Sequence, residues 1–384
     1  MLTEYALKLP NVVYAGEDST AKLALVLAEH HTTKVALFCD RSIWNLGLAA
    51  PSIKVIEEAG CAVEVTTDLV PEPSYHDVQK NVDWFRSTGA DLILAIGGGS
   101  AMDASKLVGV LCTDDYTITD LLDDPALARK QVPTVMMPTT AGTGAEVTPN
   151  AIVLVPEREL KVGIVSNAMM PDAVILDVEF IKGLPRSIAA STGLDALCHA
   201  IECFTSKKAN PFSDIFALEA LDLILKNIVP ACDEKDNLEA KRNMQLASFY
   251  AGFAITASGT TAVHALSYPL GGRFHIAHGV SNAILLMPVM HFNEPVCRER
   301  FAAAYDRCQL GDAATAEEKS AALLELMDGI VQHLDMPKNL AALGVEDVDL
   351  DSLVESGMDV QRLLVNNMRE VTPEDARNIY LQII

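Results

Sequence analysis

The sequence predicts an α/β protein in which a doubly wound parallel sheet is followed by an all-helical domain. Residues 11–177 alternate short apolar runs with helical patterns, and glycine-rich turns follow two of these runs. From Pro185 onward only helical patterns recur. Alternation of strand and helix is typical of parallel sheets that are covered by helices on both faces. We therefore expect two domains, at residues 1–185 and 186–384.

Length, charge and cysteine usage limit the class of protein. At 384 residues the chain is long enough for two domains with separate cores. Its formal charge of −23 disfavours nucleic acid and anionic membranes as partners. No stretch approaches membrane-spanning length, and the N-terminus has no basic region followed by an apolar core. The eight cysteines are scattered without a C-x-x-C pair, which favours a reducing compartment. We expect a cytoplasmic protein.

The first half of the chain contains the strand signals. Short apolar runs of the kind found in buried parallel strands are separated by amphipathic segments, with Ser19 as a candidate helix N-cap and Gly89 as a helix stop. We expect strands at residues 11–16, 34–40, 61–69, 91–96 and 133–138 and within 161–177, and helices at 19–30, 51–60, 76–89 and 104–112.

The second half is expected to be helical throughout. The acidic segment VEDVDLDSLVES is interpreted as a solvated face or a loop. Helical periodicity predicts helices at residues 187–206, 211–230, 238–257, 259–268, 279–290, 298–309, 315–334 and 374–383.

The first glycine-rich turn, GGGSAMDASK, follows an apolar strand and opens a helix. Its glycines let a ligand approach the backbone, and the free N–H groups at the helix start attract phosphate. The turn is not a G-x-G-x-x-G motif, because Met102 stands at the last glycine, and it is not a Walker A motif. The alternative is a glycine-rich turn that binds nothing.

The second turn, PTTAGTGAE, also leaves a strand, and it offers threonine hydroxyls and open backbone. Two such loops at neighbouring carboxyl ends of a parallel sheet define a crevice of the kind that binds nucleotides. Asp40 ends an earlier strand of the same unit. Near a ribose its carboxylate would accept a hydrogen bond from the 2′-hydroxyl and repel a 2′-phosphate, which favours NAD over NADP. The alternative is an ordinary aspartate at a strand end.

The helix expected at residues 187–206 carries Asp195 and His199 four residues apart. Side chains at this spacing project from one helix face, so a carboxylate and an imidazole are presented together. The helix is apolar nearly all round, which predicts burial, and a buried carboxylate requires a cation or several hydrogen-bond donors. The pair is therefore either half of a metal site or an ordinary polar pair.

Further metal ligands would come from the segment VHALSYPLGGRFHIAHG, which contains His264, His275 and His278. A helix break at Pro269 and Gly271–Gly272 would let His278 fold back toward His264. Three imidazoles and one carboxylate suit Zn(II) or Fe(II), and the affinity order of the metals does not choose between them. His275 stays open between a ligand, a proton-relay residue and a structural histidine.

Taken in this order, the motifs resemble those of the iron-containing (group III) alcohol dehydrogenases. The resemblance covers nearly the whole chain and rests on GGGSAMDASK, PTTAGTGAEVT, STGLDALCHAIE and HALSYPLGGRFHIAHG. It implies an N-terminal dinucleotide domain, an all-helical C-terminal domain and a divalent metal, in a dehydroquinate synthase-like architecture. Family members usually form dimers or larger assemblies, so a homodimer or a larger homo-oligomer is expected.

The resemblance also implies roles for individual residues. By position, the metal ligands are Asp195, His199, His264 and His278. The implied cofactors are NAD and Fe(II), with Zn(II) as the alternative metal. The implied cofactor contacts lie on the two glycine-rich turns, at one strand end and at a lysine near the nucleotide: Asp40, Gly98, Gly99, Ser100, Asp103, Thr139, Thr140, Thr143 and Lys161.

Two positions depart from the pattern that many relatives share. Many carry a second histidine four residues after the third ligand, thought to help relay protons, and this chain has Tyr268 there. A tyrosine, with a reference pKa near ~10, is a poorer relay at neutral pH, so His275 or a water chain is a substitute. Tyr268 and His275 are thus the candidates to move the alcohol proton. Many relatives also have proline where this chain has Ala277.

Our leading hypothesis is a metal-dependent oxidoreductase that transfers a hydride between a primary alcohol (or diol) or aldehyde and NAD(H). One alternative is a dehydroquinate synthase-like lyase that also uses NAD and a metal. Such a lyase needs basic residues around a phosphorylated substrate, and Arg273 is the exception in a region with few. A second alternative is a hydroxy-acid dehydrogenase of the same fold, and a third is a non-catalytic binder that kept the scaffold.

Overall fold

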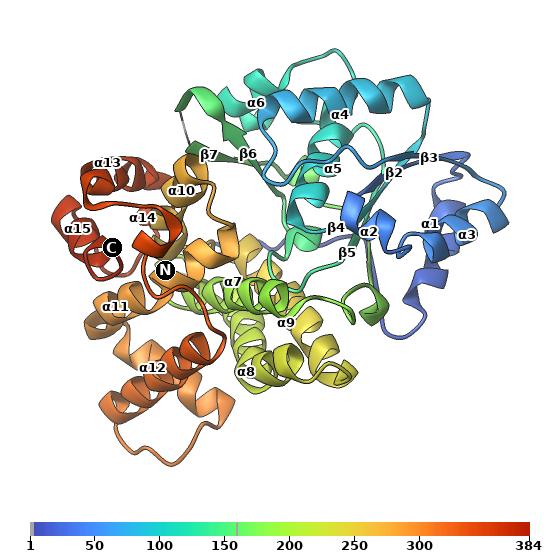
Figure 1. Ribbon diagram of the computed structural model, residues 1–384. Helices are drawn as coiled ribbons and strands as arrows, with labels where there is room; N and C mark the ends of the chain where they lie inside the picture. Colours follow the sequence, from blue (N-terminus) through green and yellow to red (C-terminus); the bar gives the residue numbers. More distant parts are fainter. Residues whose placement is uncertain (1–3, 159) are drawn as a thin grey trace. The chain divides into compact units, whose positions relative to one another are not determined.

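The computed structural model describes residues 4–158 and 160–384, and it divides into two compact units. One unit comprises residues 8–183, and the other comprises residues 184–384 together with the N-terminal residues up to Leu7. Figure 1 shows a parallel sheet with helices in the first unit and helices alone in the second. The predicted fold class is confirmed. Among the residues that the structure describes, no helix has the length and apolar character needed to cross a membrane.

The α/β unit is built on a six-stranded parallel sheet with the order β1-β8-β5-β4-β2-β3. Its central strands are continuous apolar runs that are buried along their whole length, as a sheet covered on both faces requires. The strands are β1 (Val12–Ala15), β2 (Lys34–Cys39), β3 (Ala62–Thr66), β4 (Leu92–Gly97), β5 (Thr134–Pro138) and β8 (Ala173–Leu176).

Helices cover both faces of this sheet because alternate side chains of each strand point to opposite faces. Val35 and Leu37 of β2 pack in one core, with the first three helices, whereas Phe38 packs in the other core, with the next three. The helices of the first core are α1 (Leu23–Glu29), α2 (Arg41–Asn45) and α3 (Ala50–Glu58). Those of the second are α4 (Tyr75–Thr88), α5 (Gly99–Leu111) and α6 (Ile118–Asp123).

The strand order reverses between β2 and β4, which are neighbours in the sheet. From this point the chain builds the sheet toward β3 on one side and toward β5 on the other. Such a reversal opens a crevice at the carboxyl ends of the two strands, and ligands of open α/β sheets bind there. Asp40, after β2, and the first glycine-rich turn, after β4, both lie at this edge.

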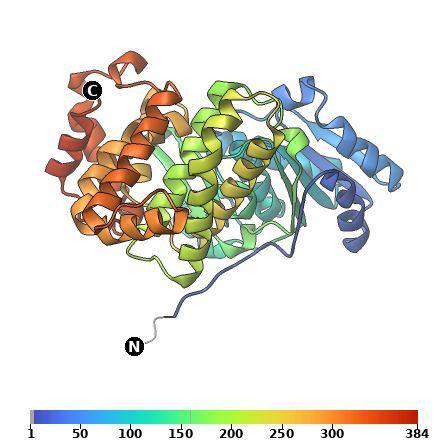
Figure 2. The ribbon, with the colours of Figure 1, turned by 90° about the horizontal axis from the view of Figure 1, so that it is seen from below.

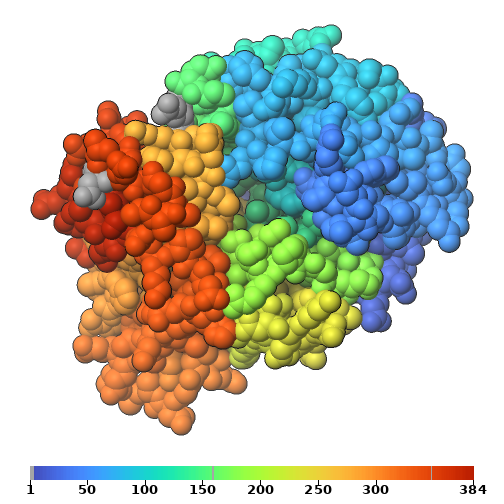
Figure 3. Space-filling view, in the orientation of Figure 1, coloured from blue at the N-terminus to red at the C-terminus, as the bar shows by residue number. Residues whose placement is uncertain are grey.

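The helical unit is arranged around α7, whose residues from Gly193 to Phe204 are all buried. This helix contacts α8, α9, α10 and α11. Figure 3 shows the C-terminal helices, in red, at the surface, where α13 packs on α15. The helices are α7 (Arg186–Phe204), α8 (Pro211–Asp233), α9 (Leu238–Ala257), α10 (Ala262–Phe274), α11 (His278–Cys308), α12 (Ala316–His333), α13 (Leu350–Asp359), α14 (Gln361–Leu364) and α15 (Pro373–Tyr380).

Residues 4–10, near the N-terminus, have no regular secondary structure, and Figure 2 shows them as an extended blue coil. Its Tyr5 ring meets the edge of Phe212 at the start of α8, with the ring centroids 5.3 Å apart. This contact attaches the segment to the helical unit, although the segment precedes the α/β unit in the sequence.

Two predicted breaks in the helical half are wrong. The helices expected at residues 279–290 and 298–309 are one continuous helix, α11, which contains Pro288 and Pro295. Pro269 and the following glycines lie inside α10 and do not break it. Proline removes one N–H donor per residue, and burial of these helices against their neighbours outweighs that loss.

Other local predictions also need correction. Ser19 is not an N-cap: it lies inside a short 3-10 helix, and its hydroxyl donates to Gly16 O at 2.7 Å. The strand β6 (Asn150–Val155) was not predicted; it pairs with β7 (Leu160–Val165) in an antiparallel hairpin outside the main sheet. The acidic segment interpreted as a solvated face or loop is consistent with the structure: from Leu350 onward it belongs to helix α13, and Glu346, Asp351 and Glu355 are exposed.

Candidate functional site

Helix α7 presents two of the four expected metal ligands, and both are buried. Asp195 is 1% exposed and His199 is 5% exposed. The helix lies close to its neighbours because Gly193 has no side chain: a Cβ there would press on Ile228 and Met244. The Oδ1 atom of Asp195 lies 3.8 Å from the Nε2 atom of His199. The pair is therefore not a solvated polar pair.

A sharp turn between α10 and α11 returns His278 toward His264. Helix α10 ends at Phe274, its C-cap His275 adopts the left-handed conformation with φ 56°, and α11 begins at His278 itself. The next residue must be glycine, because a Cβ at Gly279 would collide with the carbonyl oxygen of Ser191 on α7. This close approach holds the first turn of α11 against the helix that carries Asp195.

The four expected ligands converge. One donor atom from each of Asp195, His199, His264 and His278 lies within 4.8 Å of the others. Asp195 Oδ1 is 3.7 Å from His264 Nε2 and 3.6 Å from His278 Nε2. The edge of a tetrahedron of ligands about 2.1 Å from a divalent ion is roughly 3.4 Å. The spacing and the donor types therefore fit a divalent transition metal.

Sequence reasoning missed Glu202, which orients one of these ligands. Glu202 is fully buried on α7, and its carboxylate hydrogen-bonds the Nδ1 atom of His264. It also accepts from the N–H groups of Thr261 and Val263 and from the Thr261 hydroxyl, at 2.7–3.1 Å. With its proton on Nδ1, His264 directs the Nε2 lone pair at the cluster. The available signal was its position three residues after His199 on the same buried helix.

The electrostatics of the cluster favour charged carboxylates. Burial opposes ionisation of Asp195, but the surrounding imidazoles, His199 first, outweigh it and hold the pKa of Asp195 below its usual range. Burial also opposes protonation of His264, yet Glu202 and Asp195 raise the pKa of His264 to about 9. A cation at the Nε2 atoms would therefore be attracted by two buried negative charges.

In the α/β unit, the two glycine-rich turns lie against each other. The Thr139 N–H donates to Gly97 O at 3.0 Å, and a Cβ at Gly99 would collide with the side chain of Thr143. Asp40 faces the same turn, where its carboxylate accepts the Gly98 N–H at 3.0 Å. The turns after β4 and β5 and the end of β2 thus form one edge, as the sequence predicts, and it contains most of the expected cofactor contacts.

A buried lysine that sequence reasoning did not select fastens the second turn. Lys106 on α5 pairs with Asp103 at 2.8 Å and donates to the carbonyl oxygens of Ala145, at 3.0 Å, and Asn150. Asp103 in turn accepts the Ile152 N–H at 2.9 Å. The carboxylate of Asp103, an expected cofactor contact, is therefore engaged in holding β6 and the loop before it.

Two other expected cofactor contacts share one neighbour. Lys161 on β7 pairs with the carboxylate of Glu72 at 2.6 Å, and the Glu72 N–H donates to the Ser100 hydroxyl at 3.1 Å. Glu72 adopts the left-handed conformation with φ 53°, which is uncommon for a residue with a side chain. The hairpin lysine is thereby connected to the first glycine-rich turn.

The two candidate proton-relay residues lie differently. Tyr268 is buried on α10, with its ring centroid 6.2 Å from that of His278. His275 is exposed at the C-cap of α10 and is not part of the four-residue cluster. The structure therefore brings Tyr268 to the cluster and keeps His275 at the surface of the helical unit.

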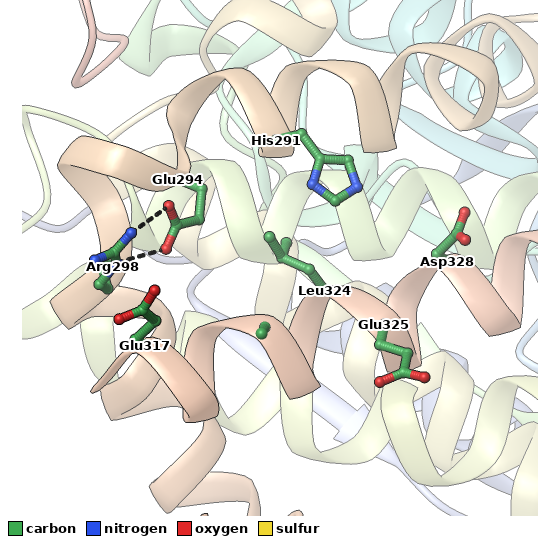
Figure 4. Close-up of a pocket in the computed structure, with 8 residues that line it drawn as sticks. His291, Glu294, Arg298, Glu317, Leu324, Glu325 and Asp328 are labelled. Carbon is green, nitrogen blue, oxygen red and sulfur yellow. Dashed lines mark hydrogen bonds and ion pairs between the residues drawn. The ribbon is translucent and has the colours of Figure 1, made fainter. Parts of the chain in front are cut away.

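A separate groove of about 510 Å³ lies along α11 and α12. Figure 4 shows Glu294 paired with Arg298 near one end, at 2.7 Å. No expected ligand or cofactor contact lines it, so it is not part of the candidate site. Its lining residues are His291, Glu294, Arg298, Glu317, Ala321, Leu324, Glu325 and Asp328.

Comparison with known proteins decides the family. Residues 10–178 match a family model described as iron-containing alcohol dehydrogenase, and residues 189–384 match one described as Fe-containing alcohol dehydrogenase family, C-terminal. The chain belongs to the iron-containing alcohol dehydrogenase family. The predicted family is confirmed, and the protein is a metal-dependent oxidoreductase of alcohols and aldehydes.

Individual family members align along nearly the full chain. Long-chain-alcohol dehydrogenase 1 of Geobacillus thermodenitrificans is 35% identical over 375 residues, covering 97% of this chain and 94% of the relative. The structure of 1,3-propanediol oxidoreductase superposes with a TM-score of 0.94 and 28% identity, over 99% of this chain and 100% of the other. Sulfoacetaldehyde reductase from Bifidobacterium kashiwanohense, solved in complex with NAD+, superposes with a TM-score of 0.89 and 28% identity, over 100% and 99%.

One departure from the common pattern of iron-containing alcohol dehydrogenases leaves the local backbone compatible with that pattern. Ala277, where many relatives have proline, has φ −54° and ψ 135° and is the N-cap of α11. Proline restricts φ to about −65°, so the alanine adopts the backbone conformation that a proline would impose. The turn that places His278 is therefore kept by other contacts, among them the close approach of Gly279 to Ser191.

Proposed function

We propose that this protein catalyses reversible hydride transfer between a primary alcohol or diol, or the corresponding aldehyde, and NAD(H), with Fe(II) as the metal. The observation that carries the proposal is the cluster of one carboxylate and three imidazoles, buried except for the partly exposed His278, in a member of the iron-containing alcohol dehydrogenase family. Such a donor set also accepts Zn(II), which is the alternative metal.

The proposal assigns a separate task to each half of the chain. Residues 1–185 would form the dinucleotide-binding domain and residues 186–384 the metal-binding domain. The compact units of the structure, with their division after residue 183, support this assignment, with the N-terminal segment up to Leu7 belonging to the helical unit. All four proposed ligands lie in the helical unit, and all proposed cofactor contacts lie in the α/β unit.

Asp195, His199, His264 and His278 would hold the metal. When bound, a divalent ion acts as a Lewis acid that lowers the pKa of an alcohol and polarises the carbonyl of an aldehyde. The protein's own contribution is to keep the four donors fixed, three of them buried and His278 partly exposed. Burial of Asp195 and the Glu202–His264 hydrogen bond both serve this purpose, because a site held by packed side chains does not reorganise during the reaction.

The cofactor would lie at the edge formed by the two glycine-rich turns. The start of α5 offers free backbone N–H groups, which suit a pyrophosphate. The Asp40 carboxylate would accept from the 2′-hydroxyl of a ribose and repel a 2′-phosphate, which selects NAD. The full set of proposed contacts is Asp40, Gly98, Gly99, Ser100, Asp103, Thr139, Thr140, Thr143 and Lys161.

We propose that Tyr268 takes part in moving the alcohol proton. Its burial and its position beside His278 support this role, because a relay residue must lie close to the reacting oxygen. His275, exposed at the end of α10, is proposed as the outer member of the relay, where it exchanges the proton with solvent.

The lyase and hydroxy-acid alternatives lose their supporting residue. Arg273, the basic residue nearest in sequence to the metal motifs, pairs with Asp349 at 2.9 Å and donates to Ser352. Because its guanidinium already bonds Asp349 and Ser352, Arg273 does not supply the anion site that a phosphorylated or carboxylated substrate needs. An uncharged alcohol or aldehyde is the better substrate.

We propose that the enzyme acts on a small molecule, as a homodimer or larger homo-oligomer, in the cytoplasm. Eight free cysteines and the absence of any disulfide among the described residues support a reducing compartment. The formal charge of −23 disfavours nucleic acid and membranes as partners.

The test is an alcohol and aldehyde screen on protein reconstituted separately with Fe(II) and with Zn(II). We expect NADH formation at 340 nm with primary alcohols or diols, NADH consumption with the aldehydes, and loss of both after chelation. A lyase would give no net NADH. Turnover that is indifferent to the chelator and to metal reloading would contradict the proposal.

A further inference from the structure

A fully buried amide lies directly against the proposed metal ligands. Asn282 follows His278 by one turn on α11 and is 0% exposed. Its Nδ2 atom donates to Asp195 Oδ1 at 2.7 Å, and it lies 3.1 Å from His264 Nε2 and 3.2 Å from His278 Nε2. One nitrogen atom thus caps the face that three of the four donor atoms form.

Among these three contacts, the one with Asp195 is compatible with a bound cation. An amide has two N–H hydrogens for three acceptors, so it cannot bond all of them at once. A cation held by His264 and His278 takes the Nε2 lone pairs of both imidazoles, whereas a ligating carboxylate oxygen keeps a further lone pair for a donor. Of the three contacts, the hydrogen bond from Asn282 to Asp195 is therefore the one that a bound cation would leave possible.

The carbonyl end of the Asn282 amide is buried without satisfying its hydrogen-bonding capacity within the described part of the chain. Among the residues that the structure describes, Asn282 Oδ1 is buried without a hydrogen-bond partner. A buried unsatisfied carbonyl destabilises a fold, and a leucine of similar size would avoid the loss. Local rules of this kind are broken mainly where function requires it. The amide end that faces the ligands is then the reason for an asparagine at this position.

We propose that Asn282 is a positioning residue of the metal site: it fixes the Asp195 carboxylate so that Oδ1 faces the three imidazoles. The inference rests on the proposed metal site. A carboxylate that is free to rotate about its last side-chain bond presents either oxygen or both, whereas a donor at 2.7 Å from Oδ1 fixes one orientation. Asn282 acts through Asp195 and does not touch the substrate.

The first experiment compares the zinc affinity of wild-type protein with that of Asn282→Leu, by competition with a chelator. We expect zinc to bind about 10- to 100-fold more weakly, the usual effect of removing such a partner. In the metal-free variant the removal of the unsatisfied carbonyl offsets the loss of the Asn282–Asp195 hydrogen bond, so we expect the thermal stability to change little. A merely structural asparagine would give the reverse: lower stability and unchanged zinc affinity. Asn282→Ala supplies the same affinity test if the leucine variant does not fold.

Asn293→Leu is the matched control, because it removes another buried amide from the same helix. Asn293 and Asn367 bond each other reciprocally, at 2.9 and 2.8 Å. This variant should lose thermal stability and keep the zinc affinity of the wild type. Weaker zinc binding in Asn293→Leu as well would mean that any lost amide on α11 disturbs the site, and the proposal would be overturned.

A double-mutant cycle with Asp195→Ala tests the route of the effect. The three imidazoles remain in this variant, so zinc affinity stays measurable. If Asn282 acts through Asp195, adding Asn282→Leu to Asp195→Ala changes the zinc affinity by less than about twofold. A further 10-fold loss would show that it acts elsewhere and would contradict the proposal. Failure of the wild type to bind zinc is a different result, which removes the metal site itself.

Discussion

The metal cluster and the nucleotide edge are built in opposite ways. The cluster takes four side chains from three helices, and its members lie up to 83 residues apart, from Asp195 to His278. The proposed nucleotide edge, formed by the turns after β4 and β5 and by Asp40 at the end of β2, consists mainly of backbone in two short turns, each continuous in the sequence. A site made of side chains depends on tertiary packing, whereas a site made of turns depends on local backbone conformation. Substitutions in the two regions should therefore impair different properties: metal binding at the cluster, and stability or cofactor preference in the α/β unit.

The two regions also balance buried charge differently. In the helical unit, each buried carboxylate at the cluster faces imidazoles or backbone N–H groups. In the α/β unit, the buried Lys106 is shared among Asp103 and several carbonyl oxygens, while burial raises the pKa of Glu146 despite the attraction of that lysine. The helical unit should thus lose metal when a charge is removed, whereas the α/β unit should gain stability when Glu146 loses its charge.

The largest effect is expected at the cluster itself. His264→Ala removes one ligand from a site whose other donors cannot move to replace it, because all lie on packed helices. We expect tightly bound metal to be lost, and alcohol oxidation to fall by at least ~10³-fold, which corresponds to several kcal/mol of Lewis-acid stabilisation. Metal analysis and the rate of NADH formation measure the two losses in one preparation.

His291→Ala is the control, because His291 also lies in the helical unit but lines the separate groove on α11. It should keep both metal and activity. Full activity of a metal-free His264→Ala preparation would contradict the account.

The next effect concerns stability in the α/β unit. Burial raises the pKa of Glu146 from its ordinary value of 4.5 to about 7, against the opposing effects of its backbone and Lys106. Between these two pH values the folded state keeps a proton that the unfolded state has released. The free energy of unfolding therefore falls as the pH rises from 4.5 to 7, by roughly 3 kcal/mol in total.

Glu146→Gln should remove this fall, because the amide does not titrate. Urea unfolding of both proteins between pH 4.5 and 8 measures the difference. The exposed Glu64→Gln serves as the control and should follow the wild type. Parallel curves for wild type and Glu146→Gln would show that the buried carboxyl keeps an ordinary pKa.

A smaller effect on metal affinity is expected at Glu202, whose carboxylate hydrogen-bonds the Nδ1 atom of His264. In Glu202→Gln the partner of Nδ1 loses its charge, so His264 becomes less basic and less firmly oriented. Metal affinity should fall about 10- to 100-fold. Chelator competition measures it, and Glu219→Gln, which breaks an exposed pair with Arg307, should leave it unchanged. Equal metal affinities of the wild type, Glu202→Gln and Glu219→Gln would show that Glu202 does not contribute to metal binding.

The smallest effect is expected at the nucleotide edge. Asp40→Asn keeps an oxygen that accepts the Gly98 N–H, so the turn stays in place, but it removes the charge that repels a 2′-phosphate. The ratio of kcat/KM for NAD to that for NADP should fall about tenfold. Asp68→Asn, at an exposed position near the next strand, is the control. An unchanged preference in Asp40→Asn would show that another residue selects the cofactor.

The same contrast explains what the sequence could predict. The turns after β4 and β5 were recognisable because glycine and threonine spacing is local information. Asp195 and His199 were recognisable as a pair because helical periodicity places them on one face. The choice of His264 and His278 as partners depended on the family resemblance, since no local pattern says which histidines meet in space.

Residues that act through long-range contacts could not be predicted. Lys106 reads as an ordinary surface lysine in a helix, and only the folded chain shows its ammonium group among the carbonyl oxygens of the loop before β6. Asn282 is one amide among many, and its role follows from a contact across 87 residues. Pro269 suggested a helix break, and residues 279–309 were divided into two helices, but packing against neighbouring helices keeps α10 and α11 continuous.

X-ray absorption spectroscopy of the Fe(II)-loaded wild-type protein tests most directly whether Asp195 and the three histidines hold one metal ion. We expect about one ion per chain, with nitrogen and oxygen neighbours and the multiple scattering of three imidazoles, and the loss of one imidazole contribution in His278→Ala held at saturating Fe(II). An iron spectrum without imidazole scattering, or one that is identical in wild type and His278→Ala, would contradict it.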